Sequence, residues 1–288
     1  MSLWHIIILA IVQGLAELLP VSSSAHVIVA EKLMGMDPAA PATTLLLVML
    51  HTGTMFAVIV YFWRRWQRAF FQTAADFKEF AIALILAVLL TGVVGGAITE
   101  GIEKGLLRHQ PHAWIEQLFD RLDLIAGALA AVGVLILISG LREKRTQTGN
   151  ETLGEIGSAQ ASWIGAVQGL CLPFRGFSRS GATISTGLLS GVPKMRAEDF
   201  SFALAVILTP VAIARESWRL FESQHHHLSP HLTSSVTSSL IGAALAFAAG
   251  LVALKWLSRW LEQGRWYWFG VYCILAAVVV GLLYHSGY

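Results

Sequence analysis

Six long apolar runs constrain the fold of this chain more than any other feature of its sequence. They cover residues 43–62, 80–98, 122–140, 200–214, 236–256 and 266–283. A helix needs about 20 residues to cross the hydrocarbon core of a bilayer, and the shortest run can extend back through Ala197. Charged residues make up only 13% of the chain, against about 25% in soluble domains. The sequence therefore predicts an all-α integral membrane protein with six transmembrane helices.

Two further apolar segments, 3–36 and 159–192, are each interrupted midway by proline, serine and glycine. Neither half of either segment is long enough to span a bilayer. Each pattern predicts a re-entrant helix–loop–helix that enters the membrane and leaves it by the same face. Irregular backbone is tolerated at membrane depth only when it is buried in protein or lines a cavity. The two interruptions are therefore expected inside the protein.

The positions of lysine and arginine predict the orientation, because these residues are more frequent in cytoplasmic loops. Twelve of the 20 follow the first, third and fifth runs and the second interrupted segment, and six fall on the opposite face. With the richer face in the cytoplasm, the first half of the chain begins outside and the second half begins inside. The charges thus predict two repeats of inverted topology. The first is 1–145, with segment 3–36 and three spans, and the second is 146–288, with segment 159–192 and three spans.

The two interrupted segments also share sequence. Val-Gln-Gly-Leu stands at 12–15 and again at 167–170, and Leu-Pro stands at 19–20 and again at 172–173. In inverted repeats the functional site lies near the midplane, where interrupted helices of both halves meet. The shared motifs therefore predict that the two segments face each other and build one site within a single membrane domain.

The second segment carries the residue types of an anion site. Arg179 at membrane depth is costly and is usually functional or paired, and it is flanked by Ser178 and Ser180. Gly176 and Gly181 let the backbone turn tightly and point N–H groups inward, at the start of a helix whose N-terminus favours anions. A guanidinium can bind two phosphate oxygens at once. A phosphate cradle is one interpretation, and the other is that Arg179 only pairs with the carboxylate of the first segment to hold the repeats together.

The first segment carries a carboxylate, hydroxyls and an imidazole. Gln13 and Glu17 are four residues apart and share one face of a half-helix. Three serines, 22–24, then form a turn, and His26 begins the returning half. Such a group can supply a base, a nucleophile or metal ligand, and an acid. Helix capping is the favoured interpretation of Ser22, whereas Glu17 requires a partner because an unpaired carboxylate in a membrane is costly.

Together the two segments predict phosphoryl chemistry on a lipid-borne substrate, which depends mainly on positioning and charge neutralisation. A divalent metal ion often bridges phosphate oxygens and a carboxylate, and Glu17 is the expected ligand. The net charge of +2 is too small to indicate a nucleic-acid partner. The same residue types also fit a transporter of an anionic lipid, and the sequence leaves that alternative open.

At these residues the chain resembles a known family. Residues 17–26, Glu-Leu-Leu-Pro-Val-Ser-Ser-Ser-Ala-His, with Gln13 upstream, resemble the first signature of the bacterial undecaprenyl-diphosphate phosphatases, membrane enzymes linked to bacitracin resistance. Residues 176–183, Gly-Phe-Ser-Arg-Ser-Gly-Ala-Thr, are similar to their second signature, and 200–206 to a further block. The resemblance runs through nearly the whole chain.

The resemblance implies hydrolysis of undecaprenyl diphosphate to undecaprenyl phosphate and inorganic phosphate, which recycles the lipid carrier of cell-wall synthesis. It implies a divalent metal ion, Mg²⁺ or Ca²⁺, as cofactor. It also implies a multi-pass protein of the bacterial inner membrane, with six spans, two re-entrant segments and an active site that faces the periplasm. A homodimer is a weaker implication, and a flippase for polyprenyl phosphate is the competing function.

The resemblance also assigns roles by motif position. It implies four catalytic residues, namely Glu17, which is also the metal ligand, Ser23, His26 as a proton shuttle, and Arg179. The expected substrate-binding residues are Gln13, Ser22, Gly176, Ser178, Ser180, Gly181 and Thr183, and Arg175 is added to them as a second cation beside the cradle. Whether Ser23 or water attacks the phosphorus stays open. Among the departures from the family, Arg175 stands in place of proline, and Tyr272 is followed by Cys273 instead of a basic residue.

Overall fold

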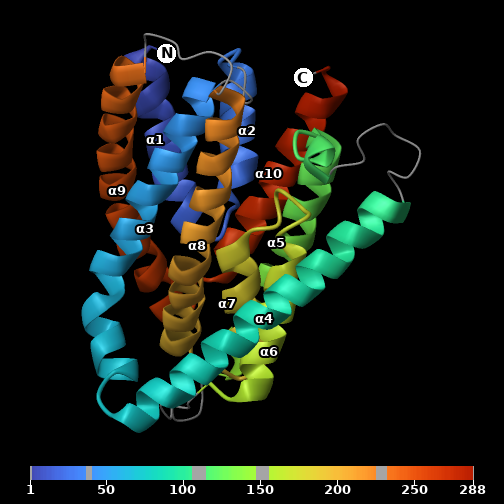
Figure 1. The fold of residues 1–288 in the computed structure, drawn as a ribbon. Coiled ribbons are helices and arrows are strands. Elements are labelled where there is room, and N and C mark those ends of the chain that lie inside the picture. Colours follow the sequence, from blue (N-terminus) through green and yellow to red (C-terminus); the bar gives the residue numbers. More distant parts are fainter. Residues whose placement is uncertain (1, 37–40, 106–114, 147–155, 225–231, 288) are drawn as a thin grey trace.

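The computed structural model describes the chain except for residues 1, 37–40, 106–114, 147–155, 225–231 and 288. The described residues form ten α-helices and one short 3₁₀ helix (Figure 1). In chain order these are α1 (Leu3–Leu18), α2 (Ser23–Leu33), α3 (Pro41–Phe70), α4 (Ala74–Gly105), η1 (Ile115–Leu118), α5 (Leu122–Thr146), α6 (Ser158–Leu170), α7 (Arg179–Leu189), α8 (Lys194–Gln224), α9 (Leu232–Glu262) and α10 (Tyr267–His285). The described part of the chain is all-helical, as the sequence predicts.

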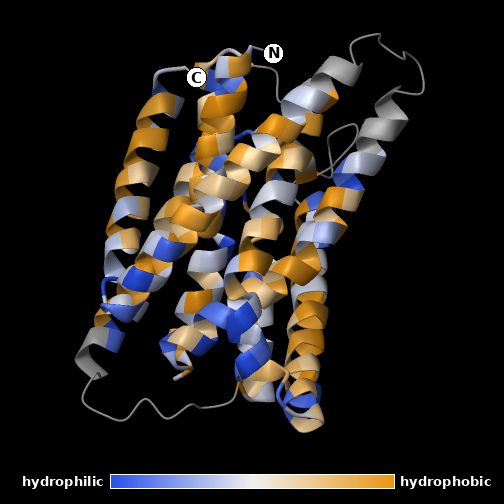
Figure 2. Ribbon diagram, turned by 90° about the vertical axis from the view of Figure 1, so that its left-hand side faces the viewer, coloured by the Kyte–Doolittle hydropathy of each residue, from blue (hydrophilic) through white to orange (hydrophobic). Residues whose placement is uncertain are grey.

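Six of these helices, α3, α4, α5, α8, α9 and α10, are long and apolar enough to cross a membrane. Apolar residues cover most of their length (Figure 2). Large apolar side chains such as Val93, Val211 and Leu282 are exposed on them, as expected where a surface faces lipid. The chain is a multi-pass membrane protein, and the prediction of six spans is confirmed.

Four shorter helices form two neighbouring pairs. α1 packs against α2, and α6 packs against α7. These helices have 16, 11, 13 and 11 residues in chain order. At about 1.5 Å per residue, none of them spans about 30 Å of hydrocarbon. The interruptions expected within 3–36 and 159–192 are the breaks between the members of each pair.

The two halves of the chain pack through each other. α1 packs against α9, and α6 packs against α4, which crosses it obliquely in Figure 1. α5 also packs against α10, and α3 against α8. The predicted boundary between repeats, at 145–146, falls at the end of α5. Every one of these contacts therefore joins an element of the first half to an element of the second.

The shared Val-Gln-Gly-Leu motif has a packing reason. Gly14 lies where α1 crosses α9, and a Cβ atom there would be 2.6 Å from the Cβ atom of Ala249. Gly169 lies where α6 crosses α4, and a Cβ atom there would be 2.8 Å from the Cβ atom of Val94. Small residues let membrane helices approach this closely. The motif that the sequence repeats thus lies at two helix crossings, α1 on α9 and α6 on α4.

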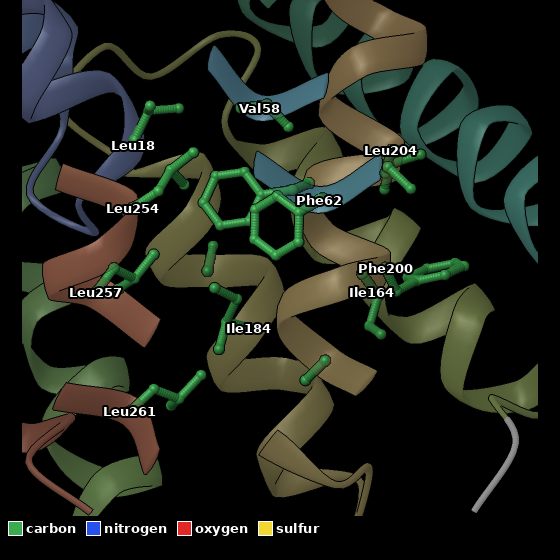
Figure 3. Packing of buried hydrophobic residues seen from close by; sticks show 14 of the residues in the cluster. Leu18, Val58, Phe62, Ile164, Ile184, Phe200, Leu204, Leu254, Leu257 and Leu261 are labelled. Atoms are coloured by element: carbon green, nitrogen blue, oxygen red, sulfur yellow. The ribbon is translucent and has the colours of Figure 1, made fainter. Parts of the chain in front are cut away.

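The largest apolar core surrounds Phe62 of α3, which is fully buried (Figure 3). Its ring stacks on Phe202 of α8, with ring centroids 5.0 Å apart. Ile184 of α7 and Leu254 of α9 belong to the same core, and so does Leu18, the last residue of α1. The core therefore fixes the end of α1 against α3, α7, α8 and α9, and the residues of both motifs lie at this junction.

A buried ionic cluster joins α3 to α8. Arg65 pairs with Glu198 and Asp199, each at an N–O distance of 2.9 Å. Ser258 of α9 donates a hydrogen bond to Glu198 at 2.5 Å. The two carboxylate side chains are 2% and 6% exposed. Arg65 lies beyond the apolar run 43–62, and it is still part of α3. The two carboxylates compensate its charge inside the protein.

Candidate active site

Glu17, in the last turn of α1, contacts side chains of both motifs. Its Oε2 atom accepts hydrogen bonds from Ser23 Oγ at 2.5 Å and from Gln13 Nε2 at 3.1 Å. Its Oε1 atom accepts a hydrogen bond from Arg179 Nη2 at 2.6 Å. The carboxylate side chain is 13% exposed and the arginine side chain 24%. The pairing of Arg179 with Glu17 that the sequence suggests is present, and a hydroxyl lies in direct contact with the same carboxylate.

A strained turn after α1 brings Ser23 back to Glu17. α1 ends at Leu18, and Ser22 then takes a φ of 69° and a ψ of 98°. Among the described residues, Ser22 is the only non-glycine residue with positive φ, a conformation that costs about 1–3 kcal/mol. It stands at the N-cap position of α2 without a capping hydrogen bond, and its Oγ lies 3.2 Å from Ser24 Oγ. Ser22 is therefore a turn residue and not a hydrogen-bonding cap.

His26 of α2 contacts this turn on one side and α10 on the other. Its Nδ1 atom lies 2.7 Å from the carbonyl oxygen of Ser22, and its Nε2 atom lies 2.7 Å from the hydroxyl of Tyr272. The two rings stack, with centroids 5.7 Å apart. Because a carbonyl only accepts hydrogen bonds, Nδ1 is the donor to Ser22. Both ring nitrogens thus have partners within the protein, and the proton-shuttle role that the resemblance implies stays a prediction.

The second motif begins α7 beside Glu17. Ser178 is the N-cap of α7, and its Oγ accepts a hydrogen bond from the Gly181 N–H at 3.3 Å. Arg179 is the first residue of α7, so its guanidinium extends from a helix N-terminus, where anions are favoured. At Gly181 a Cβ atom would be 2.8 Å from Cδ1 of Ile136 on α5. The start of α7 is therefore held by a cap and by close packing.

Ser180 and Thr183 connect α7 to its neighbours. Ser180 Oγ donates to the carbonyl oxygen of Leu19 at 3.3 Å. Thr183 Oγ1 lies 2.6 Å from Ser201 Oγ on α8. Both side chains are buried. These two hydroxyls, which were predicted to bind substrate, therefore make contacts within the protein. Ser180 contacts the residue that follows α1, and Thr183 contacts α8.

Arg175 and Gly176 lie in the loop before α7. Gly176 has a φ of 100°, and a Cβ atom there would be 2.6 Å from the carbonyl oxygen of Ile125, so this position requires glycine. Its N–H donates to Ser24 Oγ at 3.3 Å, which links the two motifs. The guanidinium carbon of Arg175 lies 4.5 Å from the centre of the Phe119 ring, a cation–π contact. Arg175 is not among the residues that line the pocket beside Glu17.

A small pocket lies beside Glu17 and Arg179, between α3 and α8. Its walls are formed by Glu17, Leu18, Thr54, Met55, Val58, Arg179, Ala205, Val206 and Thr209. The polar end combines a carboxylate and a guanidinium, whereas α3 and α8 contribute mostly apolar side chains. Charged and apolar surface therefore meet directly beside Glu17.

The sequence motifs do not include His51, which the fold brings to Glu17. Its Nε2 atom lies 3.7 Å from Glu17 Oε2, and its Nδ1 atom lies 2.8 Å from the carbonyl oxygen of Leu47. Thr54, about one turn further along α3, lines the pocket. The signal in the sequence is a histidine within a predicted span, since ionisable residues at membrane depth are usually functional. Tyr272 is a second residue that only the fold brings to the site.

Candidate metal ligands in this site are few. Among the residues that the structure describes, no group of three or more His, Cys, Asp or Glu side chains gathers in one place. Glu17 lines the pocket, and Nε2 of His51 lies 3.7 Å from its Oε2 atom. Ions such as Mg²⁺ are often held by one or two carboxylates and complete their shell with water and substrate phosphate. The residues present therefore fit a metal ion that the substrate helps to hold.

Known proteins resemble this chain over almost its full length. The profile of the family described as "Bacitracin resistance protein BacA" matches residues 6–279. The chain is 53% identical over 285 residues to undecaprenyl-diphosphatase 2 of Acinetobacter baylyi, a match that covers 97% of each chain. It is 33% identical over 285 residues to undecaprenyl-diphosphatase of Rhodopirellula baltica, which covers 98% of each. It is also 33% identical over 289 residues to undecaprenyl-diphosphatase 2 of Burkholderia orbicola, with 96% of this chain and 95% of the relative covered.

Proposed function

The chain belongs to the family of the bacitracin resistance protein BacA, and we propose that it hydrolyses undecaprenyl diphosphate at the cluster around Glu17. The activity, which leaves undecaprenyl phosphate and inorganic phosphate, rests on full-length relatives named undecaprenyl-diphosphatase. One observation supports the location. Ser23 of the first motif and Arg179 of the second both donate to the same carboxylate, at 2.5 and 2.6 Å.

Arg179 is the proposed phosphate ligand. Its Nη2 atom donates to Glu17, and a guanidinium has five N–H donors in a planar fork. The remaining donors can bind two oxygens of the terminal phosphate at the start of α7, where the helix dipole also favours negative charge. Positioning the phosphoryl group and neutralising its charge are the main contributions of a protein to this kind of reaction.

Glu17 is the proposed proton acceptor. Ser23 Oγ already donates a hydrogen bond to it, so a proton can pass with little movement. The nucleophile is either Ser23 or a water molecule beside Glu17. Its oxygen bonds to the terminal phosphorus while its proton passes to Glu17, and the bridging P–O bond breaks with its electron pair on undecaprenyl phosphate. If Ser23 is the nucleophile, a second attack by water releases inorganic phosphate and restores the serine.

A divalent ion, Mg²⁺ or Ca²⁺, is the proposed cofactor, with Glu17 as its protein ligand. Carboxylate oxygen is the ligand type that both ions prefer. When bound, such an ion neutralises negative charge on the phosphate oxygens. Glu17 then has two tasks, since it also receives the proton of the nucleophile.

Inverted repeats with re-entrant pairs α1–α2 and α6–α7 are part of the proposal. Support comes from the two equivalent crossings, α1 on α9 and α6 on α4, each with a motif glycine at the contact. Exchanging the halves converts one crossing into the other, as a two-fold axis in the membrane plane requires. With the arginine-rich end of α3 in the cytoplasm, α1–α2 enters from the periplasm and the Glu17 cluster faces that side. The homodimer stays a prediction from the family resemblance.

Phosphate release from a long-chain prenyl diphosphate by purified protein tests this function. The wild-type protein should be active with Mg²⁺ or Ca²⁺ and inactive after chelation. Arg179→Ala should lose about 10²-fold or more in kcat/KM, as is typical for removal of a preorganised donor. Arg259→Ala, an exposed arginine of α9, is the matched control and should stay within about twofold. An Arg179→Ala protein with full activity contradicts the location of the site.

A transporter of polyprenyl phosphate is the competing function. The equivalent crossings of the two halves favour it, because inverted repeats are common in transporters. Protein reconstituted into liposomes separates the two functions. Hydrolysis without lipid movement supports the phosphatase alone, whereas lipid movement without hydrolysis supports the transporter.

A further inference from the structure

His51 approaches the Glu17 carboxylate from α3 with a defined face of its ring. Its Nδ1 atom lies 2.8 Å from the carbonyl oxygen of Leu47. A carbonyl oxygen only accepts hydrogen bonds, so Nδ1 carries the hydrogen. The atom that faces Glu17 is therefore Nε2, 3.7 Å from Oε2. In the neutral ring this nitrogen presents a lone pair.

A carboxylate oxygen and an imidazole nitrogen face each other in this contact. Glu17 contributes Oε2, and His51 contributes Nε2. At 3.7 Å the two atoms are too far apart for a hydrogen bond, which spans about 2.7–3.2 Å between nitrogen and oxygen. Glu17 Oε2 already accepts hydrogen bonds from Ser23 and Gln13, whereas Nε2 of His51 has no hydrogen bond to the described residues. A cation held between the two atoms gives this nitrogen a partner.

A divalent metal ion matches the observed separation. Bonds from a metal ion to imidazole nitrogen and carboxylate oxygen are about 2.0–2.2 Å long, so two such ligand atoms lie at most about 4.3 Å apart. The 3.7 Å between His51 Nε2 and Glu17 Oε2 falls within this limit. The bond from Nδ1–H to a backbone carbonyl is also typical of metal-bound histidine, because it fixes the tautomer that leaves Nε2 for the ion.

The other histidine of the site differs in this respect. Both ring nitrogens of His26 have partners at 2.7 Å, the carbonyl oxygen of Ser22 and the hydroxyl of Tyr272. The side chain of His51 is 38% exposed, which leaves room for an ion with water or phosphate oxygens in its shell. The two imidazoles thus provide a matched comparison within one site.

We propose that Nε2 of His51 and Oε2 of Glu17 bind one divalent metal ion. The proposal rests on the proposed function, in which Glu17 is the metal ligand, and it adds a nitrogen ligand from outside both sequence motifs. Imidazole suits first-row transition ions, whereas Ca²⁺ prefers oxygen ligands. The pair should therefore bind Mn²⁺ or Co²⁺ more tightly than Ca²⁺.

Metal binding to the full-length protein without substrate tests this assignment. Purified protein is stripped of metal with a chelator, and Mn²⁺ is titrated and followed by electron paramagnetic resonance. The spin-echo signal of bound Mn²⁺ is expected to show modulation from an imidazole ¹⁴N nucleus. His51→Gln should remove this modulation and weaken Mn²⁺ binding by about tenfold or more, whereas His26→Gln should keep the modulation.

Three results overturn the proposal: a wild-type protein that binds no Mn²⁺, bound Mn²⁺ without nitrogen modulation, and modulation that survives in His51→Gln. Thermal melts check that the variants are folded, and His51→Asn replaces His51→Gln if the latter does not fold. Phosphate release by the same wild-type preparation tests the proposed function separately. An active phosphatase whose bound Mn²⁺ shows no nitrogen coupling loses only the His51 assignment.

Discussion

Glu17→Gln replaces the carboxylate at the centre of the site with a neutral amide of the same size. In the wild-type protein, Ser23 and Arg179 both donate to this carboxylate, at 2.5 and 2.6 Å. The amide keeps an oxygen acceptor but loses the negative charge and the capacity to take a proton from the nucleophile. Both contacts therefore lose their charge assistance, which accounts for roughly half of the strength of such bonds.

The size of the effect follows from these two contacts. A hydrogen bond to a charged group contributes about 1.5–3 kcal/mol, so the loss of about half of each of two such bonds costs about 1.5–3 kcal/mol. About 1.4 kcal/mol in the transition state corresponds to a tenfold change in rate, so this loss lowers kcat/KM by about 10- to 10²-fold. The melting temperature should fall as well, because the guanidinium of Arg179 loses its anionic partner.

Initial rates of phosphate release over a range of substrate concentrations measure kcat/KM for wild type and variant. Glu31→Gln is the matched control, because Glu31 of α2 is a buried glutamate, 1% exposed, and the change in charge and shape is the same. It should retain most of the wild-type activity. A folded Glu17→Gln protein with more than about a tenth of the wild-type kcat/KM would refute the central role of this carboxylate.

Three other substitutions test the supporting structure. Arg65→Ala leaves two buried carboxylates of α8 without their cation and should destabilise the protein by about 3–5 kcal/mol in thermal or denaturant unfolding. The exposed neighbour Arg64 is its control, and equal stability of the two alanine variants would contradict the ionic cluster. Gly53→Ala places a Cβ atom against a backbone carbonyl oxygen of α9 and should destabilise by about 1–3 kcal/mol, whereas Gly92→Ala, with no atom within 4 Å, should be neutral or stabilising in the same melt. Tyr272→Phe removes the hydroxyl 2.7 Å from the imidazole of α2 and should lower kcat by about two- to tenfold, the equivalent of one ordinary hydrogen bond. An unchanged kcat would show that this imidazole does not depend on α10.

The membrane spans could be predicted because crossing a bilayer is a local requirement. Any helix that faces lipid needs about 20 apolar residues in a row, and the runs 122–140 and 236–256 lie within α5 and α9. The breaks between α1 and α2 and between α6 and α7 are local as well, since proline, glycine and serine end helices wherever they cluster.

The ends of the helices depend on long-range contacts. The apolar run 43–62 suggests that the first span stops before Arg65, but α3 continues to Phe70. Arg65 is accommodated inside the protein because Glu198 and Asp199 reach it from α8. These partners lie more than 130 residues away in sequence, so no local pattern indicates them.

The residue types of the site follow from the sequence alone. A carboxylate, an arginine and hydroxyls in apolar segments are costly unless they are paired or functional, and Glu17, Ser23 and Arg179 were identifiable for this reason. Hydroxyls are harder to assign, because serine and threonine serve equally as ligands and as packing contacts. Ser180 and Thr183 hold α7 against its neighbours, a role that the same motif could not distinguish from phosphate binding.

Local patterns in the sequence are enough to identify six membrane crossings and two related polar motifs. Which imidazole lies beside the carboxylate depends on how helices that are distant in sequence pack together. The motif contains His26, but its ring is engaged by the turn and by α10, while His51 arrives from α3 to within 3.7 Å of Glu17. Local sequence decides which residues share a face of one helix. The packing of helices that are distant in sequence decides which residues contact that face.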